Sequence, residues 1–340
     1  MASEPDPSSS PGPDRPTPES ANRTPPDVAL ATSFSTAAHD AEGYLDVAQR
    51  LGAKTLVLTA SDAIPADLPA LLLALGRRRH ELRVWAVESI LGALQLGRPA
   101  AFQTRPCALD REEAQTAVTV TRAAMDLAVQ LGAGAVIVSL GSVGERGDGG
   151  ERLWQALLGK LRRGVLLYDD SAAQELRGLR AALAGRHLDA ALRSVEQMLE
   201  DASRRGLRLL LRNPTRGLEL PAAYELSALR STFSGAPLST LLDLPAAHFC
   251  STLRLLPLGE TILSFAGGAG TMPSAAPAHP SLVNLADACG PIAGLLPGQG
   301  EAQPARVARA LPMDSQRLFV PWNQLGERDV ARGLAQIGAL

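Results

Sequence analysis

The stretch LRLLLRNP, residues 207–214, predicts a buried strand that ends at Arg212. This strand follows a long helical segment, and the chain alternates helix-like and strand-like segments from residue 28 onward. Such alternation is typical of folds in which helices cover a parallel sheet. When the sheet closes into a barrel, the functional residues lie where the strands end, on the C-terminal face. We therefore expect Arg212 to stand at the functional end of a barrel.

Seven further apolar runs bring the number of predicted strands to eight. They cover residues 28–32, 55–59, 82–87, 135–140, 238–242, 282–285 and 317–320. Each run is continuously apolar rather than alternating, which is typical of strands that are covered on both faces. We predict an α/β fold, a (β/α)8 TIM barrel over residues 27–340, because the strand count and the chain length fit it. A doubly wound open sheet is the competing fold.

The segments outside these strands predict helices and loops. Helices are expected at 41–51, 66–78, 110–131, 168–205 and 327–337, the fourth with a break near Gly185. The Gly-rich segment 141–150 lacks the ending of a phosphate-binding loop and predicts a flexible connection. Residues 266–280 are rich in Gly, Ala and Pro and predict a surface insertion or lid. Residues 1–26 are rich in Pro and Ser and predict a disordered tail.

The composition argues against several classes of partner. The 340 residues are 46% hydrophobic and 4% aromatic and carry a net charge of −2. We therefore expect no nucleic-acid partner, because nucleic-acid binding needs a basic face or stacking aromatics. The three cysteines are far apart, which argues against a zinc cluster or a disulfide framework. No apolar run approaches a membrane span of about 20 residues and no signal peptide is recognisable, so we expect a cytoplasmic chain with no membrane partner.

Four segments resemble a known family in the same order along the chain. They are residues 111–138, which end in LGAGAVIV, residues 200–213 (EDASRRGLRLLLRN), residues 235–243 (GAPLSTLLD) and residues 282–301, which begin with LVNLAD and end in LPGQGE. Together they resemble the xylose isomerase-like TIM barrels, the sugar phosphate isomerase/epimerase superfamily. The resemblance covers most of residues 28–340 and implies the same barrel fold.

The resemblance implies a divalent metal at the barrel mouth, held by Glu, Asp, His and Glu from strands five to eight. Such a metal polarises a carbonyl or enediolate oxygen while carboxylates move the neighbouring proton. Carried over to this chain, the four ligand positions fall on Arg212, on Asp243, on Asn284 and near Val320 or Pro321. A further family histidine falls on Ala246. Only Asp243 is a good ligand for a hard cation, so we expect no metal cofactor.

Several polar side chains are still expected around the mouth. They are Thr59, Asp62, Glu88, Ser139, Arg212, Asn213, Asp243, Asn284 and Asp287. Asp243 either pairs with Arg212, so that a fixed cation replaces a bound one, or acts as a general base. Arg212 could instead hold a phosphate or carboxylate ligand. Glu88 is the second catalytic candidate, with a solvated loop position as its alternative.

The remaining candidates concern ligand binding. We expect Arg212, Asn213, Asn284 and Asp287 to contact a ligand at the mouth. Trp322 follows the last strand and serves either as a stacking surface for a sugar or as a plug at the barrel rim. His248 lies near a functional strand end, where a structural role is the simpler interpretation.

The leading hypothesis is a divergent member of this superfamily that has lost metal-dependent catalysis. It would keep a ligand-binding or regulatory role toward a small sugar or an anionic ligand. The alternative is an active isomerase or epimerase that uses acid/base catalysis without metal, or Mg²⁺ or Mn²⁺ at a rearranged site. That site would consist of Glu88, Asp243, Asp287 and His248. DNA repair of the endonuclease type is disfavoured because it needs several metals and a basic face. The sequence does not determine the oligomeric state, and a homodimer is one possibility.

Overall fold

The computed structural model describes residues 27–34, 40–59, 68–98, 104–144, 148–165, 170–265, 282–312 and 314–340. The predicted tail (1–26), the predicted insertion (266–280) and Asp62 lie outside these ranges. Within them no helix is long and apolar enough to cross a membrane.

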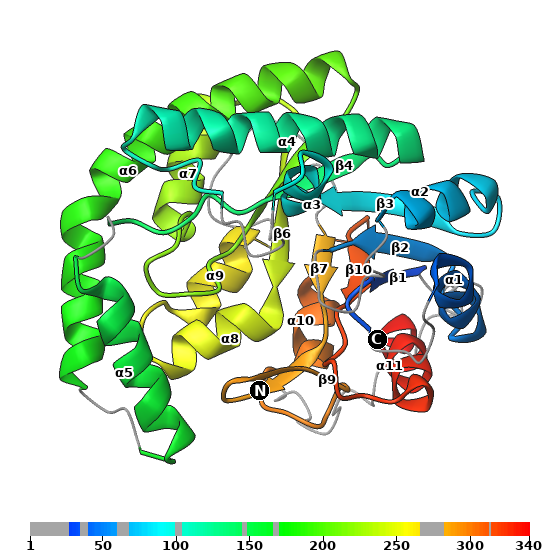
Figure 1. The fold of residues 1–340 in the computed structure, drawn as a ribbon. Coiled ribbons are helices and arrows are strands. Elements are labelled where there is room, and N and C mark those ends of the chain that lie inside the picture. Colours follow the sequence, from blue (N-terminus) through cyan, green and yellow to red (C-terminus); the bar gives the residue numbers. More distant parts are fainter. Residues whose placement is uncertain are drawn as a thin grey trace, which may run out of the picture.

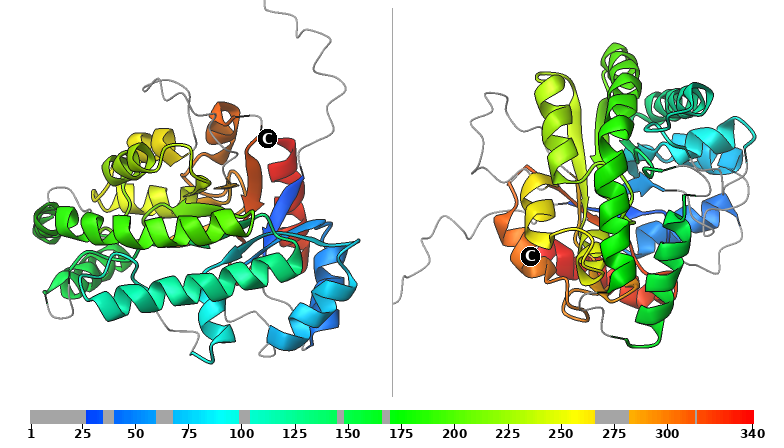
Figure 2. Two further views of the ribbon diagram at one scale, coloured as in Figure 1. Left: turned by 90° about the horizontal axis from the view of Figure 1, so that it is seen from above. Right: turned by 90° about the vertical axis from the view of Figure 1, so that its left-hand side faces the viewer.

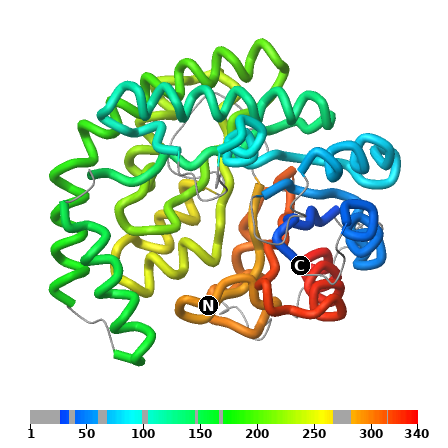
Figure 3. Tube along the Cα trace, in the orientation of Figure 1, coloured from blue at the N-terminus to red at the C-terminus, as the bar shows by residue number. Residues whose placement is uncertain are grey.

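Parallel strands form a closed barrel at the centre of the molecule (Figure 1). In the described ranges these are β1 (Val28–Ala31), β2 (Thr55–Leu58), β3 (Arg83–Glu88), β4 (Ala135–Val138), β5 (Arg208–Arg212), β6 (Leu238–Asp243), β7 (Leu282–Asn284) and β10 (Gln316–Phe319). Each strand pairs with its neighbour in the chain, and β10 pairs with both β7 and β1. Figure 3 traces how the red C-terminal part returns beside the blue first strand. The predicted TIM barrel is confirmed, and the open sheet is excluded.

Alternation of side chains divides the apolar strand residues into two cores. One set points into the barrel and fills it with small and branched side chains, among them Ala29, Ala86, Ile137 and Leu210. The other set points outward and packs against the helices in a much larger cluster. Because both faces are buried, the strands need apolar residues at nearly every position. This is why the strands could be predicted from continuous apolar runs.

Helices surround the barrel, and several begin at an aspartate that accepts a backbone hydrogen bond. They are α1 (Ala41–Arg50), α2 (Leu68–Arg77), α3 (Ile90–Gln95), α4 (Arg111–Leu131), α5 (Gly150–Arg162), α6 (Ser171–Arg204), α7 (Ala223–Thr232), α8 (Leu244–Thr252), α9 (Leu258–Phe265), α10 (Pro304–Ala310) and α11 (Glu327–Ala339). Asp40, Asp110, Asp170 and Asp243 are the capping aspartates. Such caps satisfy N–H groups that a helix leaves without a partner at its start.

The two longest helices, α4 and α6, lie against each other on one side of the barrel (Figure 2). The break expected in α6 near Gly185 is wrong, because the helix is continuous from Ser171 to Arg204. Tertiary contacts stabilise α6 near Gly185. The buried His187, one half-turn after Gly185, accepts a hydrogen bond from Gly144 N at 2.9 Å. Its other ring nitrogen lies 2.8 Å from Cys107 O, so the ring ties two loops to the helix.

An antiparallel hairpin, β8 (Asp287–Cys289) and β9 (Ile292–Leu295), follows β7 and was not predicted. Residues 296–303 connect the hairpin to α10. The hairpin contacts the chain beyond the last barrel strand, since Trp322 N donates a hydrogen bond to Gly294 O at 2.9 Å. It therefore builds part of the rim on the C-terminal side of the barrel.

Candidate active site at the barrel mouth

The mouth is formed by the side chains that follow the inward-pointing core residues by two positions. Because side chains alternate along a strand, the inward Ala86, Leu210, Leu241 and Leu282 are followed by four polar residues that face the same interior. Those residues are Glu88, Arg212, Asp243 and Asn284, each the last residue of its strand. The predicted position of these four at the mouth thus follows directly from the strand ends.

Arg212 is bound by two carboxylates at the centre of this ring. Its Nε donates to Asp243 Oδ2 at 3.1 Å, its Nη2 donates to the same oxygen, and its Nη1 donates to Glu88 Oε1 at 3.3 Å. Burial by itself would lower the pKa of Arg212, but the charges of Asp243 and Glu88 raise it above its ordinary value. The guanidinium is therefore a permanent cation. The predicted pairing of Arg212 with Asp243 is confirmed, and Glu88 ends β3 at the mouth rather than lying in a solvated loop.

Asp243 has hydrogen-bond donors on both carboxylate oxygens. Besides the contacts of Oδ2 with Arg212, its Oδ1 accepts from Asn284 Nδ2 at 3.1 Å and from Ala246 N at 3.4 Å, which caps helix α8. The Asn284 Oδ1 in turn accepts from the backbone N–H groups of Ala286 and Val320, at 3.2 and 3.3 Å. One connected network therefore joins the ends of β3, β5, β6, β7 and β10 across the mouth.

Two of the residues predicted to contact a ligand are buried and form hydrogen bonds with the backbone. Asn213 is 1% exposed; its Oδ1 accepts from Asp243 N at 2.6 Å and its Nδ2 donates to Asp243 O at 3.3 Å. Asp287 is also 1% exposed and accepts four backbone N–H groups at 2.9–3.0 Å. These donors belong to Ala288, Gly298, Gly300 and Ala302. Asn213 thus links the ends of β5 and β6, and Asp287 stabilises the loop after the hairpin.

His248 and Trp322 lie outside the network of Arg212. His248 is in α8, with its Nε2 3.7 Å from Glu301 Oε2. Trp322 is partly buried and its backbone is bonded to the hairpin. Both expected roles of its ring, the sugar-stacking surface and the rim plug, stay predictions.

The donor set at the mouth does not fit a divalent metal. In the described part of the chain, no three His, Cys, Asp or Glu side chains are grouped so that they could hold a metal ion. The proposed rearranged set is not brought together: Glu88 and Asp243 are bound to Arg212, Asp287 to the loop amides, and His248 faces Glu301. A guanidinium and a carboxamide occupy two of the ligand positions that the resemblance implies. The guanidinium has no lone pair to offer a cation, and the Oδ1 atom of Asn284 already accepts from the backbone N–H groups of Ala286 and Val320.

Two hydroxyl groups at the mouth lack a hydrogen-bond partner. Ser33 follows β1 and Thr59 follows the neighbouring β2, and the oxygen of each side chain is buried without a partner. Thr59 was expected in the ring, whereas Ser33 was missed. Its position two residues after the inward Ala31 could have indicated it. An unsatisfied buried hydroxyl costs free energy unless a ligand or water bonds to it.

Comparisons with known proteins support the fold. No protein-family model and no curated protein matches the sequence. Among solved structures, a provisionally assigned xylose isomerase from Rhodospirillum rubrum matches with a TM-score of 0.59 and 14% identity, over 92% of this chain and 98% of that one. A D-tagatose 3-epimerase-like protein gives 0.55 and 13%, over 90% and 94%. An L-ribulose 3-epimerase gives 0.53 and 13%, over 92% of both chains. The fold is that of the xylose isomerase-like TIM barrels.

Proposed function

We propose that this chain binds a small, neutral polyhydroxylated ligand, a sugar or a close relative, at the barrel mouth and has lost metal-dependent isomerase chemistry. The observation that carries the proposal is the position of Arg212, whose guanidinium is bound by both Asp243 and Glu88. A fixed cation there replaces the charge of a metal but has no open coordination position for a substrate oxygen. The role that remains for the site is ligand binding or regulation.

The charges and hydroxyl groups of the mouth favour a neutral ligand over an anion. One guanidinium faces two carboxylates, so this cluster has no positive charge left to attract a phosphate or a carboxylate. Ser33 and Thr59 offer buried hydroxyl groups without partners. The hydroxyl groups of a sugar can both donate to and accept from such groups. Solved proteins with the same fold include sugar epimerases, which agrees with this class of ligand.

The test measures binding of D-tagatose, L-ribulose and xylose by calorimetry, with the chain held in EDTA. We expect one of these sugars to bind, and Thr59→Val to weaken its binding by about 3- to 10-fold, the typical value of one hydrogen bond. Thr119→Val on the exposed face of α4 is the matched control and should bind as the natural chain does. Absence of binding by all three sugars, or equal effects of the two variants, would contradict the proposal.

A second experiment addresses the metal-dependent alternative. The thermal midpoint is measured with Mg²⁺, Mn²⁺, Co²⁺ and Zn²⁺ in excess, because a metal that binds the folded chain alone raises it by mass action. We expect no shift. A shift that disappears in Asp243→Asn would restore the isomerase hypothesis. Sugar isomerisation in EDTA that is lost in Glu88→Gln would instead favour catalysis without metal.

A further inference from the structure

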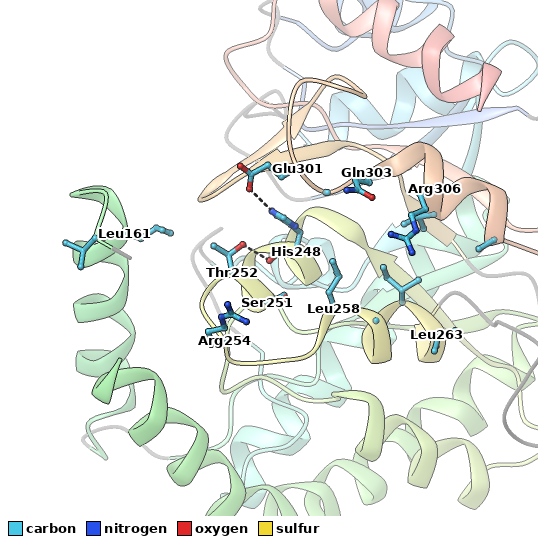
Figure 4. Close-up of a pocket in the computed structure, with 16 residues that line it drawn as sticks. Leu161, His248, Ser251, Thr252, Arg254, Leu258, Leu263, Glu301, Gln303 and Arg306 are labelled. Atoms are coloured by element: carbon cyan, nitrogen blue, oxygen red, sulfur yellow. Dashed lines mark hydrogen bonds and ion pairs between the residues drawn. The ribbon is translucent and has the colours of Figure 1, made fainter. Parts of the chain in front are cut away.

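A second cavity lies outside the network at the barrel mouth. It is a groove of about 1000 Å³ between the end of α5, helices α8 and α9, and the segment 301–310 that contains α10 (Figure 4). Neither Arg212, Asp243 nor Glu88 contributes to its lining. Its volume matches the upper range of cavities that bind small molecules in proteins. A ligand in this groove would not contact the ring of residues proposed to bind a sugar.

One part of the groove is apolar and open to water. Leu161 and Val165 contribute from α5 and the turn after it, and Leu258, Ile262 and Leu263 from α9. Leu263 is 61% exposed and Val165 45% exposed. Exposed aliphatic side chains that gather on one surface are a common mark of a binding site. The groove therefore offers a surface for the apolar body of a ligand.

The other part of the groove carries positive charge. Arg254 and Arg306 line it and lie on either side of His248 in Figure 4. No carboxylate in the described ranges forms an ion pair with Arg306. Glu301 is the acidic residue of the lining; it is 67% exposed and its closest basic contact is His248 at 3.7 Å. The charges of the groove thus sum to at least +1.

Two features mark the polar part of the groove: a histidine nitrogen without a partner and an unusual backbone conformation at Arg254. The Nε2 atom of His248 is buried and has no hydrogen-bond partner, since 3.7 Å to Glu301 exceeds hydrogen-bonding distance. Arg254 has a φ angle of 58°, in the left-handed region that favours glycine, just past the end of α8. A long cationic side chain at such a position costs conformational energy, and such strain is often kept where it serves a function.

We propose that this groove binds a small amphiphilic anion, with one acidic head group near Arg306, Arg254 and His248 and an apolar body against α9. The head group supplies a partner for the buried Nε2 atom of His248 and an ion pair that Arg306 does not form with any described residue, and the apolar body covers Leu263 and Val165. This site is independent of the proposed sugar site, so either can fail while the other holds.

The probe for the test is 8-anilinonaphthalene-1-sulfonate, which joins a sulfonate to an apolar ring system and fluoresces when bound. We expect one probe per chain. Arg306→Glu should weaken its binding by at least about fivefold, since the change replaces an attractive charge with a repulsive one. Arg309→Glu is the matched control on the same helix, because Arg309 is exposed and does not line the groove. It should leave binding unchanged.

Further experiments distinguish recognition of the anionic charge from hydrophobic binding of the ring system and from loss of folding. N-phenyl-1-naphthylamine, which lacks the sulfonate, should bind Arg306→Glu and the natural chain alike. Arg254→Gly should raise the thermal midpoint, because it relieves the left-handed residue, while it weakens sulfonate binding. Competition by decanoate and by decyl phosphate then identifies the preferred head group. Circular dichroism checks that each variant is folded.

Three results would overturn the proposal. Equal binding by Arg306→Glu and Arg309→Glu would show that the charge of Arg306 is not used. Equal sensitivity of the neutral probe to Arg306→Glu would show that no anion is recognised. A light-scattering mass that falls from dimer to monomer in Arg306→Glu would show that a second copy of the chain covers the groove.

Discussion

At the scale of single residues, Arg212 defines the chemistry of the mouth because it neutralises carboxylates that are partly or fully buried. The side chain of Asp243 is 8% exposed and that of Glu88 is 19% exposed. Without a cation between them these groups would be left close together with little solvent to separate their charges. The stability of the barrel therefore depends on a residue that faces its functional end.

Replacing Arg212 tests this dependence. We expect Arg212→Met to lower the free energy of unfolding by about 2–4 kcal/mol, because it leaves buried charges without a partner. Urea denaturation measures the change. The matched control is Arg216→Met, which removes an exposed ion pair to Glu151 and should cost less than about 1 kcal/mol. Equal losses in both variants would mean that the network at the mouth adds no particular stability.

The three cysteines differ in reactivity according to burial. Burial raises the pKa of the Cys107 thiol to about 12, and it raises the pKa of Cys250 as well, whereas Cys289 is exposed in the hairpin. Because the thiolate is the reactive form, we expect a thiol reagent at pH 8 to modify Cys289 alone in the folded chain. All three should react in denaturant. The Cys289→Ser variant should show no fast reaction in the folded state. A thiol that still reacts fast in this variant would contradict the assignment.

The sequence allowed some of these residue roles to be predicted and not others. The pairing of Arg212 with Asp243 could be predicted because both end neighbouring parallel strands. The roles of Asn213 and Asp287 could not, because their partners are backbone groups of loops whose shapes do not follow from apolar periodicity. Ser33 and Thr59 could not be singled out as binding groups, because the missing partners of their buried hydroxyl groups are visible only in the folded chain.

At the scale of elements, Asp287 determines the shape of the loop after the hairpin. Its carboxylate accepts the N–H groups of Ala288, Gly298, Gly300 and Ala302, so one side chain satisfies four backbone donors. The same loop contains Glu301, which faces His248 on α8. Asp287 thereby fixes one wall of the groove that we propose as a second binding site.

Removing this carboxylate should loosen the loop. We expect Asp287→Ala to speed amide hydrogen exchange across 296–302 and to lower the free energy of unfolding by about 2–4 kcal/mol, because buried donors lose their acceptor. The control is Asp314→Ala, an exposed aspartate before β10, which should change neither. Unchanged exchange in Asp287→Ala would show that the loop is held by other contacts.

The contact between α4 and α6 depends on another buried carboxylate. Asp201 accepts hydrogen bonds from Arg122 on α4 and from Arg204 on its own helix, and Arg205 lies within 3.3 Å. Burial by itself would raise the pKa of Asp201, but the bonds from Arg122 and Arg204 lower it below its ordinary value. The ionised form is therefore stabilised in the folded chain.

This lowered pKa predicts how the contact responds to pH. Stability from Asp201 is fully present above its unfolded pKa of about 3.9 and is lost as the pH falls through its lower folded pKa. We expect Asp201→Asn to lower the free energy of unfolding by about 2–3 kcal/mol at pH 7, because the arginines around the buried Asp201 side chain lose their carboxylate partner. The difference from the natural chain should shrink as the pH falls below about 4. Urea titrations at several pH values test this, and a constant difference would contradict it.

The elements themselves were predicted unevenly, for physical reasons. Long helices such as α4 and the strands of the barrel carry a strong apolar pattern and were predicted. The β8–β9 hairpin and helices α3, α5, α7, α8, α9 and α10 were not predicted. Most of these segments are short, and an apolar pattern over few residues does not distinguish a helix from a buried strand. The expected break at Gly185 did not occur because contacts along α6, including those of His187, outweigh the small helix penalty of one glycine.

At the scale of the whole molecule, the fold could be predicted more securely than the function. Eight buried strands close a barrel whatever side chains stand at its mouth, so the fold tolerates replacement of the residues that carry the chemistry. The three solved structures compared above share 13–14% identity with this chain and have the same barrel. The network around Arg212 is what separates the proposed binding role from catalysis.

The contacts of Asp243 also bear on evolutionary reversibility. Building a metal site through Arg212→Glu would place a third carboxylate beside Asp243 and Glu88, and each such like-charge contact costs about 1–4 kcal/mol at 4 Å. Building one through Asn284→His would first remove the amide that bonds Asp243 and the backbone of Val320. Either first step lowers stability before a metal can offset the loss. Under the proposed loss of metal-dependent chemistry, this arginine therefore opposes the recovery of a metal site, and the mouth can change mainly in what it binds.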